Sequence, residues 1–304
     1  MSALVVVAGA TGNLGGRIAR ALRERGADVV APVRPGTAPE RLAPLCALGA
    51  TVVPVDLRDG SGLARAIAGA SCVVSALNGL GDVIVEAQTA LLDAAVVAGV
   101  PRFVPSDYSI DFTRLPPGRN RNLDLRREFH GRLEDRTIAA TTVFCGAFAD
   151  LLAGRMPLVL FKRRRVLFWS DADLRMDFTT AADTAAFTAC AALDPSTPRF
   201  LRIAGDRLSA RELAAVATGV TGESFRVLRA GSLGMLGALI AVARAVAPGR
   251  GEPFPAWQGM QYLRDMFDGR ARLAPLDNDR YPGLRWTRAR DVLMAREAAR
   301  RGRP

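Results

Sequence analysis

The sequence has very little histidine and very little lysine. Among its 304 residues, His130 is the only histidine, and Lys162 is the only lysine among 41 basic residues. A single histidine excludes a metal site built on several histidines. Heavy use of alanine and arginine with almost no lysine is typical of a bacterial genome rich in G and C.

Cysteine is also scarce, and no long apolar run occurs. The four cysteines are far apart and form no CxxC pair, which predicts small buried thiols in a reducing compartment and no metal site. These are Cys46, Cys72, Cys145 and Cys190. The most apolar later stretch, 231–249, contains Arg244 and is short for a membrane span, so we expect a helix there and no transmembrane segment. The first apolar run has no positive segment before it, and we expect a strand rather than a signal peptide in a cytoplasmic protein.

Acidic residues are fewer than basic residues, 30 against 41, and the formal net charge is +11. The arginines are spread along the chain, and no basic stretch is interleaved with aromatic residues. This distribution favours a phosphorylated ligand over nucleic acid or a membrane surface as the anionic partner.

Strand and helix patterns alternate through residues 1–150. Strands are expected at 4–9, 28–33, 51–56, 71–77, 102–104 and 140–144, and helices at 12–25, 38–49, 60–69, 82–99 and 121–136. This order predicts an α/β fold with a Rossmann-type, doubly wound parallel sheet.

Residues 151–304 predict a smaller, mixed α/β region that covers the substrate and shares one globule with the first. A hairpin is expected at 158–171 with a solvated basic turn at 162–165, followed by strands and helices. The strands are expected at 199–204 and 224–229, and the helices at 181–193, 208–220, 231–247 and 256–268. The last two helices are rich in apolar residues, which favours packing in a core or a homodimer, with a lid over an apolar substrate as the alternative.

A glycine-rich loop follows the first strand and opens the first helix. Gly9 permits a tight turn, Gly12 lets the backbone approach a pyrophosphate, and Gly15 lets helix and strand pack closely. The N–H groups of the helix N-terminus then bind the phosphates. The strand–turn–helix context predicts dinucleotide binding. The residues assigned to this loop are Gly9, Ala10, Thr11, Gly12, Asn13, Leu14 and Gly15.

The second strand indicates which dinucleotide is bound. Selectivity for NAD requires an acidic residue at the end of this strand, but Asp28 lies at its start and Arg34 at its end. Arg34, together with Arg41 from the next helix, favours the 2′-phosphate of NADP(H). Further along the groove, at the carboxyl ends of the strands, the expected cofactor contacts are Asp56 and Leu57 beside the adenine, and Ser75, Ala76, Leu77 and Pro105.

These motifs resemble the NmrA-like and isoflavone-reductase-like branch of the atypical short-chain dehydrogenases. The resemblance rests on "VAGATGNLGG", "PVRPG…PER", "VVSALNG", "QTALLDAAVVAGVPRFVPSDY" and "AATTVFCGAF", and covers about residues 3–150. It implies NADP(H) on the glycine loop and a substrate pocket under the C-terminal region. It also implies a catalytic lysine on the helix after the PSD loop, where this chain has Arg127, or alternatively Arg126, at the matching position.

The groups after the fifth strand are the candidates for chemistry. Ser106 is expected to bond a carbonyl oxygen, Tyr108 or His130 to donate a proton, and Arg127 to stabilise the oxyanion. The Tyr-x-x-x-Lys pair is absent, because Phe112 stands where the lysine would be. Two hypotheses follow: an NADPH-dependent reductase of a carbonyl or activated double bond in a small aromatic or polyketide-like molecule, or an NADP(H)-binding redox sensor without turnover.

Overall fold

The computed structural model describes residues 2–301, which form two compact units. Unit 1 consists of the chain up to Tyr108, Asn122–Val143 and Thr184–Leu201. Unit 2 consists of Ser109–Arg121, Phe144–Asp183 and the chain from Arg202 onward. One segment on each side of residue 150, Ser109–Arg121 and Thr184–Leu201, thus belongs to the unit that is otherwise formed by the other half of the chain.

Unit 1 is built on a six-stranded sheet in the order β3-β2-β1-β4-β5-β6, and all printed pairings are parallel. The strands are β1 (Leu4–Ala8), β2 (Asp28–Val33), β3 (Thr51–Pro54), β4 (Cys72–Ser75), β5 (Arg102–Val104) and β6 (Ala139–Ala140). The strand order turns back between β1 and β4, so the expected doubly wound Rossmann-type sheet is confirmed. In such a sheet the crevice beyond these two strands is where ligands bind.

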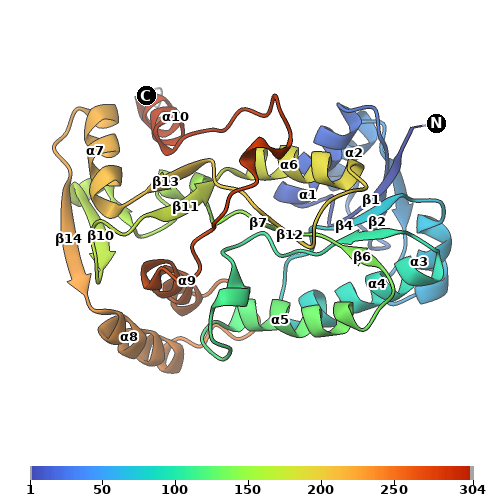
Figure 1. Cartoon of the computed structure of the whole chain (residues 1–304), viewed down its shortest axis with the longest axis horizontal. Helices are drawn as coiled ribbons and strands as arrows, with labels where there is room; N and C mark the ends of the chain where they lie inside the picture. The colour runs from blue at the N-terminus through green and yellow to red at the C-terminus, as the bar shows by residue number, and fades with distance from the viewer. Residues whose placement is uncertain (1, 302–304) are drawn as a thin grey trace. The chain divides into compact units, whose positions relative to one another are not determined.

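Helices cover both faces of this sheet (Figure 1): α1, α2 and α6 lie on one face and α3, α4 and α5 on the other. Their bounds are α1 (Asn13–Arg23), α2 (Pro39–Ala47), α3 (Gly60–Ile67), α4 (Gln88–Val97), α5 (Arg121–Glu134) and α6 (Ala181–Leu193). Under the second group, Leu63, Leu91 and Phe129 pack against Val73 and Phe103 in one buried apolar cluster. Burial of these side chains fixes the strand ends that carry the site.

The helix expected at 82–99 forms in two parts. Its first six residues are a π-helix, η1 (Asp82–Ala87), which continues into α4. Wider turns of this kind occur often at functional sites.

The strand expected at 140–144 is divided into β6 and β7 (Thr142–Phe144) because the backbone changes partner. The N–H of Thr141 donates to Phe103 on β5, whereas the N–H of Thr142 donates to Arg199, beside β12 (Phe200–Arg202). β7 and β12 form a separate two-stranded sheet.

Unit 2 contains two three-stranded sheets, β13-β11-β8 and β14-β10-β9. Their strands are β8 (Ala147–Phe148), β9 (Val159–Leu160), β10 (Arg165–Trp169), β11 (Met176–Thr179), β13 (Asp206–Leu208) and β14 (Arg226–Gly231). The helices are α7 (Ala210–Thr221), α8 (Leu233–Val246), α9 (Ala256–Asp268) and α10 (Ala289–Arg301), with short 3₁₀ segments η2 (Phe112–Arg114), η3 (Ala149–Ala153), η4 (Phe161–Arg163) and η5 (Asn278–Arg280).

Among residues 151–304, the expected hairpin and the four expected helices, α6 to α9, are confirmed, whereas β11, β13 and α10 were not predicted. β9 and β10 are antiparallel, and η4 forms the turn between them. The prediction that all four cysteines are buried is wrong for Cys46, which is exposed on α2, a helix that buries only Leu45, and for Cys190, which is only partly buried. Cys72 and Cys145 are buried, and burial raises the pKa of Cys72 to about 12.

Candidate cofactor and active site

The glycine loop has the geometry that its sequence predicts. Gly9 has φ +81°, and a Cβ atom there would lie 2.6 Å from the carbonyl oxygen of Ala76. A Cβ at Gly15 would lie 2.2 Å from the carbonyl oxygen of Gly9. Neither position accepts a side chain, so the loop after β1 lies directly against the loop after β4, and α1 packs tightly against the turn.

The N-terminus of α1 has backbone N–H groups that can bind an anion. Its N-cap residue is Gly12, no side chain caps it, and its first turn contains no acidic residue. The first N–H groups of a helix have no partner within the helix, and the helix dipole favours a negative charge there. The loop therefore suits a pyrophosphate, which would bind to these N–H groups. Of the loop residues, Gly12 and Asn13 are exposed and Ala10 is buried.

One of the two arginines predicted for the 2′-phosphate reaches this loop. Nη2 of Arg41 lies 3.5 Å from Oγ1 of Thr11. Arg34 is exposed just after β2. Asp28 starts that strand and pairs with Arg23 at 2.9 Å, so it belongs to the opposite end of the sheet from the glycine loop.

The predicted adenine contacts follow β3. Asp56 is exposed and accepts a hydrogen bond from the N–H of Arg58 at 2.9 Å, and Leu57 is partly buried. They stand at the carboxyl end of a strand, as the prediction requires, on the side of the sheet that carries Arg34.

The end of β4 contains an unused polar group. Ser75 is fully buried, and its Oγ has no hydrogen-bond partner among residues 2–301. A buried hydroxyl without a partner is costly in a folded protein. Ser75 lies beside the switch point of the sheet, where the prediction places the cofactor groove.

Ser106 connects the loop after β5 to the loop after β4. Its Oγ donates to the carbonyl oxygen of Leu77 at 2.6 Å, and its N–H donates to Oε1 of Gln88 at 2.9 Å. The hydroxyl proton is therefore engaged by the backbone, and Ser106 offers a substrate lone pairs rather than the donor that the sequence suggested. Pro105, which precedes it, is buried.

His130 belongs to a buried polar network on α5. Its Nε2 lies 2.5 Å from Oδ2 of the fully buried Asp107, which also accepts from Oγ1 of Thr142 at 2.9 Å. Arg199 donates to Thr142 at 2.8 Å and lies 3.4 Å from Nδ1 of His130. Burial alone would raise the pKa of Asp107, but the charges of His130 and Arg126 and the hydrogen bonds outweigh it and lower that pKa.

The two arginines of α5 point to different surroundings. Arg126 is buried, and its Nε donates to the carbonyl oxygen of Ser106 at 3.0 Å. Arg127 is partly exposed and lies 3.9 Å from Asp124 on its own helix. The structure therefore brings Arg126, the alternative to Arg127 at this position, to the loop after β5. Tyr108, at the end of that loop, is buried.

Sequence reasoning missed three residues that hold this loop in place: Gln88, Thr142 and Arg199. Gln88 is a fully buried polar residue inside an apolar helix, and that isolated position was the available signal. Thr142 and Arg199 carried no such signal, because strand pairing far along the chain brings them to His130.

Two structural features are absent from residues 2–301. No helix in that range has the length and apolar character needed to cross a membrane. Within the same range, no group of three or more histidine, cysteine or acidic residues is arranged to bind a metal ion.

Several known proteins are similar in sequence to this chain. Pinoresinol reductase 1 from Arabidopsis thaliana is 32% identical over 210 residues, which is 64% of this chain and 65% of that protein. The match thus spans slightly less than two thirds of that relative. An isoflavone reductase homologue from Zea mays is 30% identical over 73% of this chain and 75% of its own length.

Solved structures share the fold. A structure of AtPrR2 with NADP⁺ and (+)-pinoresinol superposes with a TM-score of 0.80 at 22% identity, and covers 97% of this chain and 99% of that one. The NADPH complex of the quinone oxidoreductase QOR2 from Escherichia coli has a TM-score of 0.74 at 20% identity, over 96% and 99%.

The motifs of the first 150 residues suggested a family, and the family model confirms it over a longer stretch. The model of the NmrA-like family matches residues 1–233, which include the glycine loop, the loop after β5 and α5. The chain belongs to the NmrA-like family.

Proposed function

We propose that the protein is an NADPH-dependent reductase of a small aromatic molecule, acting on a carbonyl or an activated double bond. The relatives named above are reductases of aromatic compounds, and the related structures contain NADP⁺ or NADPH. The glycine loop, the uncapped α1 and Arg41 support the same cofactor in this chain.

One observation carries the proposal: an unbroken series of contacts links the phosphate loop to the polar loop after β5. Gly9 lies against Ala76, the next residue Leu77 accepts from Ser106, and the carbonyl of Ser106 accepts from Arg126. A cofactor bound at the switch point would therefore have Ser106 and its neighbours at the edge of its groove.

In this arrangement NADPH, when bound, supplies the hydride. The chain supplies position, charge and a proton. Arg126 is a permanent cation at the loop after β5, and an arginine keeps its proton at any working pH. We assign the proton donor to Tyr108, which stands two residues after Ser106 on that loop.

His130 takes a positioning role in this proposal rather than that of proton donor. Its two ring nitrogens face Asp107 and Arg199, and the side chain is only 7% exposed. Asp107 lies between Ser106 and Tyr108, so a fixed Asp107 also fixes the backbone of both neighbours.

The alternative is an NADP(H)-responsive sensor without turnover. It is favoured by the arginines at the position where the family has its lysine, and by the engaged proton of Ser106. Both functions require the cofactor, so they are separated by turnover alone.

The test is to titrate the purified protein with NADPH and NADH by nicotinamide fluorescence, then to add aromatic aldehydes, ketones, quinones and lignan-type benzylic ethers. Tight NADPH binding followed by cofactor oxidation with one of these substrates supports the reductase. Tight binding with no oxidation by any of them supports the sensor.

A homodimer is also part of the proposal. Four apolar side chains of α8 are at least half exposed: Met235, Leu239, Val242 and Val246. Their spacing of i, i+4, i+7 and i+11 places them on one face of the helix, and contiguous exposed apolar side chains often mark an interface. We expect light scattering to give the mass of two chains, and a Val242→Glu variant to give the mass of one.

A further inference from the structure

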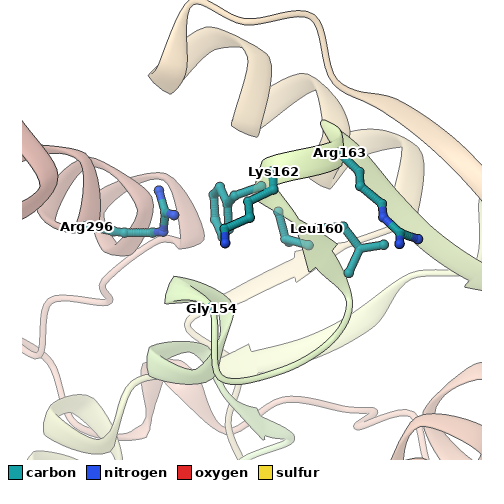
Figure 2. A pocket seen from close by; sticks show the side chains of 7 residues that line it. Gly154, Leu160, Lys162, Arg163 and Arg296 are labelled. Atoms are coloured by element: carbon teal, nitrogen blue, oxygen red, sulfur yellow. The ribbon is translucent and has the colours of Figure 1, made fainter.

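A hollow lies in unit 2, between the β9–β10 hairpin and α10 (Figure 2). Its volume is about 530 Å³, within the range of about 300–1,000 Å³ that is typical of small-molecule pockets. The lining residues are Gly154, Val159, Leu160, Phe161, Lys162, Arg163 and Arg296. None of the residues of the proposed cofactor site is among them.

The lining is basic and contains no acidic residue. Lys162 and Arg163 are exposed on η4 at the turn of the hairpin, and neither has an ion pair among the described residues. Glu223 faces a third cation of the turn, Arg164, at 4.0 Å. The two cations therefore keep their full charge toward the hollow and the solvent.

Arg296 supplies a third cation from α10, held in a fixed orientation. Its guanidinium carbon lies 3.3 Å from the centroid of the Phe161 ring, so the two planar groups are in contact. Its Nε donates to the carbonyl oxygen of Ala153 at 3.2 Å and its Nη1 to Glu297 at 2.5 Å. Neither contact uses Nη2. Glu297 is shared with Arg300 at 2.9 Å, so the local charge stays positive.

The rest of the lining is apolar. Val159 is buried, and Leu160 and Phe161 are partly buried beside it. A second aromatic ring, Phe225, supports Phe161 with its centroid at 5.9 Å and an interplanar angle of 75°. Figure 2 shows the side chains of Lys162 and Arg296 directed toward the same side of the hollow, with Arg163 on the other side of Leu160.

We propose that this hollow binds an aromatic carboxylate. The carboxylate is bound by Lys162 and by Nη2 of Arg296, the nitrogen that neither Ala153 nor Glu297 uses, and the ring lies on the apolar lining. An inorganic anion would leave the apolar part unused, and an uncharged aromatic molecule would leave the cations unused. This site is separate from the reductase function proposed above.

The test uses cinnamate, titrated calorimetrically into the full chain saturated with NADPH. Lys162→Gln removes one cation from the lining, and Arg164→Gln removes the same charge from the adjacent turn residue, which does not line the hollow. We expect Lys162→Gln to weaken cinnamate binding about tenfold, and Arg164→Gln to change it by less than about twofold. Cinnamyl alcohol, which has the ring without the charge, is expected to bind at least about tenfold more weakly than cinnamate.

A second readout needs no variant. Because Lys162 is the only lysine, an amine-acylating reagent modifies this side chain and the α-amino group, and peptide mass spectrometry separates the two. At a cinnamate concentration of ten times its Kd, acylation of Lys162 should slow about tenfold while that of the α-amino group is unchanged.

Cinnamate affinity that is equal in the wild type and Lys162→Gln, or acylation of Lys162 at an unchanged rate, would overturn the inference. Neither result would bear on the proposed NADPH binding and turnover, because Lys162 lies outside the proposed cofactor site. If the wild-type protein oxidises no NADPH but cinnamate still protects Lys162 from acylation, only the proposed reductase function is overturned.

Discussion

Replacing His130 by alanine tests whether the buried network holds the loop after β5. In the folded protein Asp107 is fully buried, and His130 provides its shortest contact, at 2.5 Å. His130→Ala removes that partner, while the Thr142 hydroxyl and the positive charges of Arg126 and Arg199 still stabilise the carboxylate.

The expected cost follows from this geometry. Breaking a buried pair by removing one partner costs about 3–5 kcal/mol, because the remaining charge stays buried. The remaining contacts of Asp107 place this variant at the lower end, about 3 kcal/mol. At roughly 2–4 °C per kcal/mol for a chain of this size class, the Tm should fall by about 6–12 °C.

The assay is thermal unfolding followed by circular dichroism at pH 7. Arg132→Ala is the matched control on the same helix: Arg132 pairs with the exposed Glu86 at 2.8 Å, and its loss should move the Tm by about 2 °C or less. A double variant, His130→Ala with Asp107→Asn, should be more stable than His130→Ala alone, because it no longer buries the Asp107 carboxylate without its histidine partner. Equal Tm values for His130→Ala and Arg132→Ala would refute the reasoning.

The pH dependence of this difference follows from Asp107. Its pKa in the folded protein is lowered, because the His130 and Arg126 charges and the hydrogen bonds outweigh burial. A lowered pKa stabilises the fold at pH values above the ordinary value of 3.8 and loses that effect as the pH falls below it. The Tm difference between the wild type and His130→Ala should therefore shrink below about pH 4.

Three further predictions concern binding and turnover. Gly12→Asp places a carboxylate at the N-terminus of α1 and should weaken NADPH binding at least about tenfold. Gly60→Asp, the same change at the first residue of α3, should leave NADPH binding unchanged. Equal NADPH Kd values for the two variants would show that the loop is wrongly assigned. Arg41→Gln should weaken NADPH binding about tenfold and leave NADH binding unchanged, as measured by fluorescence titration, and an equal loss for both would contradict a 2′-phosphate contact. Tyr108→Phe should lower kcat about 100-fold without changing the NADPH Kd, and an unchanged kcat would remove Tyr108 as the proton donor.

Much of the α/β architecture could be predicted from the sequence. The β-branched runs of β1 and β4 are buried on both faces and signal a parallel sheet, and the bounds of β2, α6 and α9 match the expected ranges. β11 and β13 could not be predicted, because each has only three or four residues and exists through its pairing with the other. α10 buries only three side chains among many arginines, which leaves a weak apolar pattern.

The candidate site was predictable to the extent that its residues are local in sequence. The glycine loop directly follows its strand, and Gly15 is required by a contact with Gly9 six residues earlier, although the contact that requires Gly9 is with the distant Ala76. The role of His130 was not predictable, because it depends on Asp107, Thr142 and Arg199, which are brought together by the change of pairing partner after β6. Helix spacing alone likewise could not show that Arg126 contacts the loop.

The central claim is that the loop after β1 binds NADPH for use in a reduction. The most direct test is fluorescence titration of the purified protein with NADPH and NADH, followed by absorbance at the nicotinamide band after aromatic carbonyls, quinones and benzylic ethers are added. We predict tight binding of NADPH, weaker binding of NADH, and oxidation of NADPH with at least one aromatic substrate. Failure to bind either cofactor would contradict both the reductase and the sensor.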